Sequence, residues 1–113
     1  MRNPTQRLME LAAAGHTTYD REGLICLLRE GHQLYHAGLA ETSAVITDQQ
    51  NGTPLDEILR QCLLGGMPPP SGALREEAIG ALAYIQWEQT PAALAYVELV
   101  EVASLRGVSL VPE

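Results

Sequence analysis

The sequence contains no phenylalanine, and one tryptophan and four tyrosines are the only aromatic residues among its 113 positions. Hydrophobic residues nevertheless make up 46% of the chain, which is enough for a buried core and argues against wholesale disorder. That core must consist mainly of leucine, alanine, valine and isoleucine. Aliphatic cores of this kind favour helices packed on helices over a β-sandwich. At this length we expect one helical protein-interaction domain that covers residues 1–113.

Lysine is also absent, and the seven positive charges are arginines scattered singly along the chain. With fourteen acidic residues, the net charge is −7. Binding to a phosphate backbone needs a dense basic surface, so we expect no direct contact with nucleic acid. The acidic residues are spread too evenly to imitate DNA. We therefore interpret the negative charge as an aid to solubility.

No apolar run approaches the roughly 20 residues that a membrane-spanning helix requires, so we expect no membrane association. Residues 1–4 lead into a polar helix start and not into the apolar segment of a signal peptide, which favours a cytoplasmic protein. Cysteine is scarce as well. Cys26 and Cys62 occupy apolar positions of helical patterns, and we expect two buried thiols in preference to a disulfide.

Three segments open with a capping residue followed by proline: Asn3-Pro4, Thr53-Pro54 and Thr90-Pro91. Proline is tolerated at the first helical position because its missing N–H would have no partner inside the helix. We therefore predict helix starts at Pro4 and Pro54. At Pro91, the sequence leaves open whether a new helix begins or the preceding helix is kinked.

The spacing of apolar residues predicts four or five helices. The first is expected over 4–14, with its end at Gly15. The second is expected to begin after residue 18 and to extend as far as 46. The third is expected over 54–64, with its end at Gly65-Gly66. The fourth is expected over 73–89, with Leu74 among its inward residues. Residues 48–52 are expected to form a turn, 67–72 a stiff connector and 108–111 a short extended C-terminal tail.

Two features of these helices concern packing. Gly23, Gly31 and Gly38 recur at a spacing that would let another helix approach closely, although each also weakens a helix. From 92 to 105, almost every residue that is not acidic is apolar, so this helix is apolar on more than one face. A chain this short cannot cover all of that surface, and we expect a homodimer.

His32 and His36 lie four residues apart and therefore share one face of the second helix. Gln33 stands where a zinc protease of the His-Glu-x-x-His type needs its catalytic glutamate, and a structural zinc would need two more ligands. We interpret the pair as polar or interface histidines, with a small metal-dependent protein as an alternative. Since no nucleotide-binding or nucleophile motif is present, we expect no enzyme, no cofactor and no metal.

Aromatic residues often dominate protein interfaces, and the sequence places Tyr84 three residues before Trp87 and Tyr35 beside the histidine pair. These positions define the predicted partner interface, which consists of His32, Tyr35, His36, Leu39, Tyr84 and Trp87.

The order of these segments resembles a known family. A capped helix rich in Leu, His and Tyr (23–39) is followed by a proline-bearing loop, by Ala83-Tyr84-Ile85-Gln86-Trp87 in a helical C-terminal region up to Gly107, and by an aliphatic tail, 108–112. In helix order and length this resembles the small helical antiactivators of bacterial quorum sensing, the TraM and QslA type, over about two thirds of the chain. The resemblance implies an all-α dimer that binds a LuxR-type transcription factor and blocks its dimerisation or DNA binding. The glycine-rich second helix departs from that family.

Two further functions remain open from the sequence. An anti-defence inhibitor of a phage or mobile element would share the size, acidity and helicity of this chain. A structural subunit of a larger complex would also fit, and it would be poorly soluble alone.

Overall fold

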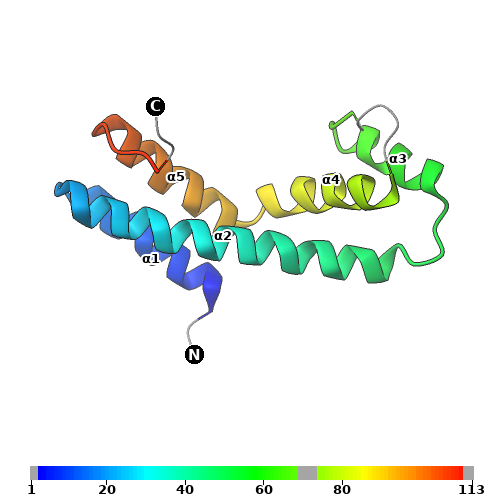
Figure 1. Ribbon diagram of the computed structural model, residues 1–113, viewed down its shortest axis with the longest axis horizontal. Coiled ribbons are helices and arrows are strands. Elements are labelled where there is room, and N and C mark those ends of the chain that lie inside the picture. Colours follow the sequence, from blue (N-terminus) through cyan, green and yellow to red (C-terminus); the bar gives the residue numbers. More distant parts are fainter. Residues whose placement is uncertain (1–2, 69–73, 111–113) are drawn as a thin grey trace. The chain divides into compact units, whose positions relative to one another are not determined.

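A computed structural model describes residues 3–68 and 74–110. Within these ranges five α-helices follow one another without a strand (Figure 1), which confirms the predicted all-α class. They are α1 (Pro4–Thr17), α2 (Arg21–Gln49), α3 (Leu55–Leu64), α4 (Arg75–Glu88) and α5 (Pro91–Leu105). None of these helices is both long and apolar enough to cross a bilayer.

The chain divides into two compact units. Unit 1 comprises Met1–Ala37 and Thr90–Glu113, and unit 2 comprises Gly38–Gln89. Helix α2 contributes residues to both. The expectations of a single domain and of a homodimer stay predictions.

The capping residues set two of the helix starts as expected. The side-chain oxygen of Asn3 accepts a hydrogen bond from the Thr5 amide at 2.9 Å, and the Thr90 hydroxyl accepts one from the Ala93 amide at 3.2 Å. Pro91 therefore begins a helix and does not kink one. The third start differs from the prediction, because Pro54 takes the capping position itself without a side-chain bond and α3 begins at Leu55.

The predicted end of the first helix at Gly15 is wrong, since α1 continues to Thr17. Gly15 is buried inside the helix, where a Cβ would lie 2.8 Å from Cδ1 of Leu99. The missing side chain therefore serves close packing against α5. Gly66, in contrast, does end a helix as predicted, and its φ of +88° is one that a residue with a side chain rarely adopts.

Helix α2 runs to Gln49, so the expected turn at 48–52 is shorter than predicted. Arg75 stabilises the segment that follows, because its guanidinium donates hydrogen bonds to the backbone carbonyls of Gln50 and Thr53. Bonds from a charged donor are stronger than neutral ones. One arginine at the start of α4 thus fixes the connection between α2 and α3.

Arginines also join the helices of unit 1. Arg7 of α1 donates through two nitrogens to the Glu30 carboxylate on α2, one of them at 2.8 Å, and through a third to Glu10. These bonds, first of all those to Glu30, raise the pKa of Arg7 above its ordinary value. Arg106 donates to the carbonyls of Gly15, His16 and Thr18, and it thereby satisfies the last carbonyls of α1.

The core of unit 2 is aliphatic, as the composition predicts. It contains Ile46, Ile58, Cys62, Ala78, Ile79, Leu82 and Ala83. Helices α3 and α4 pack against each other over this cluster. Leu74, expected to face inward, is 64% exposed, because it precedes α4 and does not lie within it.

The recurring glycines of α2 have different surroundings. A Cβ on Gly31 would approach Tyr96 and Leu99 of α5, and a Cβ on Gly38 would overlap the indole of Trp87. Gly23 meets only the neighbouring Thr18 and Asp20. Gly31 and Gly38 thus leave room for side chains of a neighbouring helix, whereas Gly23 faces only the residues just before it.

The tail after α5 forms no strand within the described residues. The Val108 amide donates to the carbonyl of Ala103, and the Val108 side chain is buried. Residue 111 of the predicted tail and 69–72 of the predicted connector lie outside the described residues.

The two cysteines differ, and the expectation that both are buried is wrong for Cys26. Cys26 is exposed on α2, whereas Cys62 is fully buried and its thiol contacts the carbonyl of Ala78 at 3.4 Å. Burial raises the pKa of the Cys62 thiol, which lowers the reactive thiolate fraction further.

We expect a water-soluble disulfide reagent to modify Cys26 of the native protein within minutes and Cys62 at least about tenfold more slowly, because only the exposed thiol forms an accessible thiolate. The release of the reagent's chromophore measures both rates. In Cys26→Ser the fast phase should vanish and the slow phase should remain. Two equal fast phases in the native wild type would contradict the burial of Cys62.

Candidate functional site

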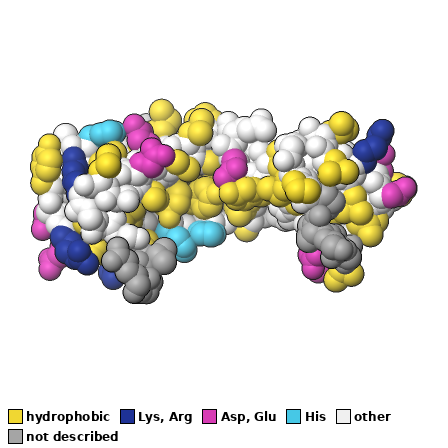
Figure 2. All heavy atoms as spheres, turned by 90° about the horizontal axis from the view of Figure 1, so that it is seen from above, with side chains coloured by type: hydrophobic (Ala, Val, Ile, Leu, Met, Phe, Trp, Pro, Cys, Tyr) yellow, Lys and Arg dark blue, Asp and Glu magenta, His cyan; other side chains and the backbone are white. Residues whose placement is uncertain are grey.

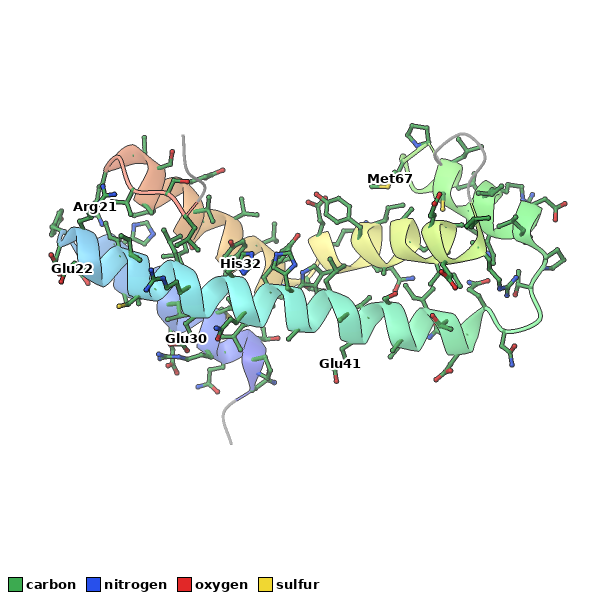
Figure 3. The ribbon with its side chains drawn as sticks, in the orientation of Figure 1. Arg21, Glu22, Glu30, His32, Glu41 and Met67 are labelled. Atoms are coloured by element: carbon green, nitrogen blue, oxygen red, sulfur yellow. The ribbon has the colours of Figure 1, made fainter. Side chains whose placement is uncertain are left out.

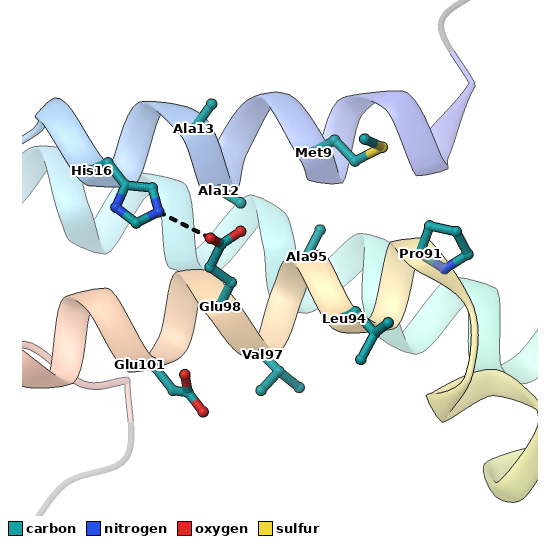
Figure 4. Close-up of a pocket in the computed structure, with 10 residues that line it drawn as sticks. All are labelled: Met9, Ala12, Ala13, His16, Pro91, Leu94, Ala95, Val97, Glu98 and Glu101. Atoms are coloured by element: carbon teal, nitrogen blue, oxygen red, sulfur yellow. Dashed lines mark hydrogen bonds and ion pairs between the residues drawn. The ribbon is translucent and has the colours of Figure 1, made fainter.

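An open groove of about 660 Å³ lies along α1 and α5 in unit 1 (Figure 4). Its floor is formed by small side chains, above all Ala12 and Ala95, which lie between the two helices. Both alanines are buried. Small residues let helix backbones approach closely, so the groove is shallow and its walls come from larger residues on either side.

The walls of the groove are apolar and exposed. Met9 of α1 is 54% exposed, and Leu94 and Val97 of α5 are 58% and 44% exposed. On α5, Leu94 and Val97 follow the spacing of one helical face, which continues to the acidic Glu101. A groove with exposed apolar residues at this spacing can bind the apolar face of another helix.

Acidic groups border this apolar surface. Glu98 forms a hydrogen bond with His16 across the groove, with Oε1 and Nε2 3.1 Å apart, and Glu101 lies one turn further along α5 (Figure 4). Helix α5 carries these two carboxylates and no basic residue. The lining therefore combines an apolar floor with a negatively charged edge.

A second candidate surface is the aromatic and histidine cluster, which we define as His32, Tyr35, His36 and Tyr96. The ring centroids of His32 and His36 are 4.2 Å apart, those of Tyr35 and His36 are 5.3 Å apart, and those of Tyr35 and Tyr96 are 4.8 Å apart. Figure 3 shows His32 leaving α2 on the side away from Glu30. Figure 2 shows histidine side chains at the surface next to hydrophobic ones.

A smaller cavity of about 490 Å³ adjoins this cluster. Its lining is mainly apolar, with His32, Tyr96 and two serines as polar groups, and consists of Leu28, His32, Tyr96, Val100, Ser104, Val108, Ser109 and Leu110. Burial, and to a lesser extent the neighbouring Tyr35, raises the pKa of the Tyr96 hydroxyl above its ordinary value. A phenol with its ordinary pKa of about 10 is already protonated at neutral pH, so the upward shift leaves the Tyr96 hydroxyl a hydrogen-bond donor.

Within unit 1, the structure brings three residues of the predicted interface together. His32, Tyr35 and His36 form one cluster in unit 1, whereas Leu39, Tyr84 and Trp87 belong to unit 2. Leu39 packs against the core of unit 2, and Trp87 is only 7% exposed against Gly38. Trp87 is thus a core residue in this structure and not the predicted surface anchor, whereas Tyr84 is partly exposed.

Sequence reasoning did not identify the groove. Its walls include Met9 and Pro91, which no chemical motif marks, and its two helices are separated by more than seventy residues of sequence. The one available signal was the excess of apolar residues in the last helix, which correctly indicated exposed apolar surface there.

Comparisons with known proteins found no matching family model, no matching curated protein and no matching solved structure. Within the described residues, no group of three or more His, Cys, Asp or Glu side chains is placed to hold a metal ion together.

Proposed function

We propose that this chain is a cytoplasmic, non-enzymatic protein-binding inhibitor that receives a helix of its partner in the groove between α1 and α5. The observation that carries this proposal is the exposed apolar wall of Met9, Leu94 and Val97 beside a closely packed floor. Exposed apolar residues scattered singly are ordinary on protein surfaces, whereas a continuous apolar groove rimmed by polar residues is typical of an interaction site.

The charges of the groove define the chemistry of the partner. With Glu98 and Glu101 at its edge and a net charge of −7 on the chain, the groove favours an amphipathic helix whose apolar stripe is flanked by arginine or lysine. Complementary charge also speeds association. Transcription factors present such basic helices, because they must bind the phosphate backbone of DNA.

The resemblance to quorum-sensing antiactivators suggests the particular partner. We propose a LuxR-type transcription factor, which this protein, acting as a homodimer, would prevent from dimerising or from binding DNA. A helix held in the groove would no longer be available for either contact. Apolar surface of α5 outside the groove, such as the 39% exposed Val100, supports self-association.

We expect replacement of both Leu94 and Val97 by glutamate to weaken binding of the LuxR-type regulator by about 100-fold or more, since loss of a central interface residue costs about 2 kcal/mol or more and 1.4 kcal/mol is tenfold. The regulator is recovered from host lysate on the wild-type protein, identified by mass spectrometry, purified, and titrated calorimetrically. Leu64→Glu is the matched control, because Leu64 is also exposed but lies on α3.

Light scattering and circular dichroism on the same variants separate the outcomes. The double variant should keep its helices and its dimeric mass, because the proposed occupant of the groove is the regulator. A double variant that becomes a monomer would show that a second copy occupies the groove. Capture of a nuclease or defence complex would assign the anti-defence function instead. If no protein were specifically captured, the proposal would be overturned.

A further inference from the structure

The histidine pair of α2 has a geometry that suits a metal ion. His32 and His36 are both exposed on one face of the helix, and their ring centroids are 4.2 Å apart with the ring planes inclined by 50°. The two imidazoles are thus already close together. Because both side chains are exposed, an ion can reach them from the solvent without disturbing the core.

We propose that His32 and His36 together bind one divalent copper or nickel ion, with the remaining coordination positions open. With metal–nitrogen bonds of about 2.0 Å, each ring centroid lies about 3.2 Å from the ion. Two such centroids would be about 4.5 Å apart at a right angle between the bonds and about 5.2 Å apart at a tetrahedral angle. The observed 4.2 Å is nearer to the first value.

The preferred angle between ligands differs among cations. Right angles between ligands occur in the square-planar and tetragonal sites of Cu²⁺ and Ni²⁺, whereas Zn²⁺ in proteins prefers a tetrahedron. Affinity for nitrogen ligands also rises from Ni²⁺ to Cu²⁺. The expected order is therefore Cu²⁺, then Ni²⁺, then Zn²⁺.

The surroundings of the pair bear on its affinity. Tyr35 contacts His36 edge to face at a centroid distance of 5.3 Å, and Tyr35 in turn lies against Tyr96 with the two rings tilted by 31°. Neighbours that orient a ligand ring strengthen a metal site. Arg29, one turn before His32, is exposed, and its repulsion of a cation is screened by water and salt. With two protein ligands the site should bind reversibly.

The test is a calorimetric titration of the untagged full-length protein with NiCl₂, in a Cys26→Ser background so that the exposed thiol does not compete. We expect one ion per chain, and at least tenfold weaker binding after His36→Gln. His16→Gln is the matched control, since it removes the third histidine, which pairs with Glu98, and should leave binding unchanged. Proton NMR with Ni²⁺ should broaden the ring signals of His32 and His36 before those of His16.

Four results would overturn the proposal. They are no binding of Ni²⁺ or Cu²⁺ at millimolar concentration, unchanged binding in His36→Gln, tighter binding of Zn²⁺ than of Cu²⁺, and one ion per two chains. Because both histidines are exposed, their replacement by glutamine leaves the core intact and a loss of binding reports on the site. The proposal is independent of the groove, and either can fail without the other.

Discussion

Replacement of Trp87 by alanine is expected to lower the free energy of unfolding by about 3–5 kcal/mol, the usual loss when a buried aromatic side chain is truncated. Trp87 is 7% exposed and packs directly over Gly38, where no side chain could replace the lost contacts. Small domains are stable by only about 5–15 kcal/mol. Urea unfolding followed by circular dichroism measures the change.

Gly38 provides a matched test of the same contact. A Cβ at this position would lie 2.1 Å from the nearest indole carbon, which is a severe overlap. Gly38→Ala should therefore destabilise by about 1–3 kcal/mol, although alanine by itself favours a helix by about 1 kcal/mol. In a Trp87→Leu background the overlap is relieved and the same change should become neutral or stabilising.

Gly80 serves as the control, because it lies inside α4 and a Cβ there would have no neighbour within 4 Å. Gly80→Ala should stabilise by up to about 1 kcal/mol. If Gly38→Ala behaved like Gly80→Ala, the indole could not occupy the place described here.

The second large effect is expected in unit 1, where replacement of Leu99 by alanine should cost about 2–5 kcal/mol. Leu99 is fully buried, and its two methyl groups face Gly15 of α1 and Gly31 of α2. The side chain thus joins the three helical segments of this unit. Removing it leaves a space that two glycines cannot fill.

Leu105→Ala on the same helix is the control, since Leu105 is 88% exposed and its truncation should change the stability by less than about 0.5 kcal/mol. Gly15→Ala should destabilise the wild type and partly restore the Leu99→Ala variant, because its methyl group would enter the vacated space. Equal losses from Leu99→Ala and Leu105→Ala would contradict the packing of α5 on α1.

The features that the sequence predicts correctly depend on residues near one another along the chain. Asn3 and Thr90 cap helices because their oxygens reach amides two or three positions later. Gly66 ends α3 because of its own backbone conformation. Helix number and fold class follow from such local rules together with the spacing of apolar residues.

The features that the sequence misses depend on contacts between distant residues. Glycine commonly ends helices, so the sequence predicts a helix end at Gly15. Leu99, eighty-four positions later, packs against Gly15, and the helix continues. Tryptophan is common among interface anchors, but the Trp87 side chain is buried in the space that the missing side chain of Gly38 leaves. The histidine pair was found because both residues lie on one helix, whereas the groove requires two helices from opposite ends of the chain.

The single tryptophan also makes this chain its own fluorescent reporter. Trp87 lies in unit 2, so its emission follows the opening of that unit alone, whereas far-ultraviolet dichroism follows the helices of both units. Coincident transitions by the two signals would identify one cooperative folding unit, and separated transitions two. A buried indole beside a glycine thus allows the cooperativity of the whole molecule to be measured without any added label.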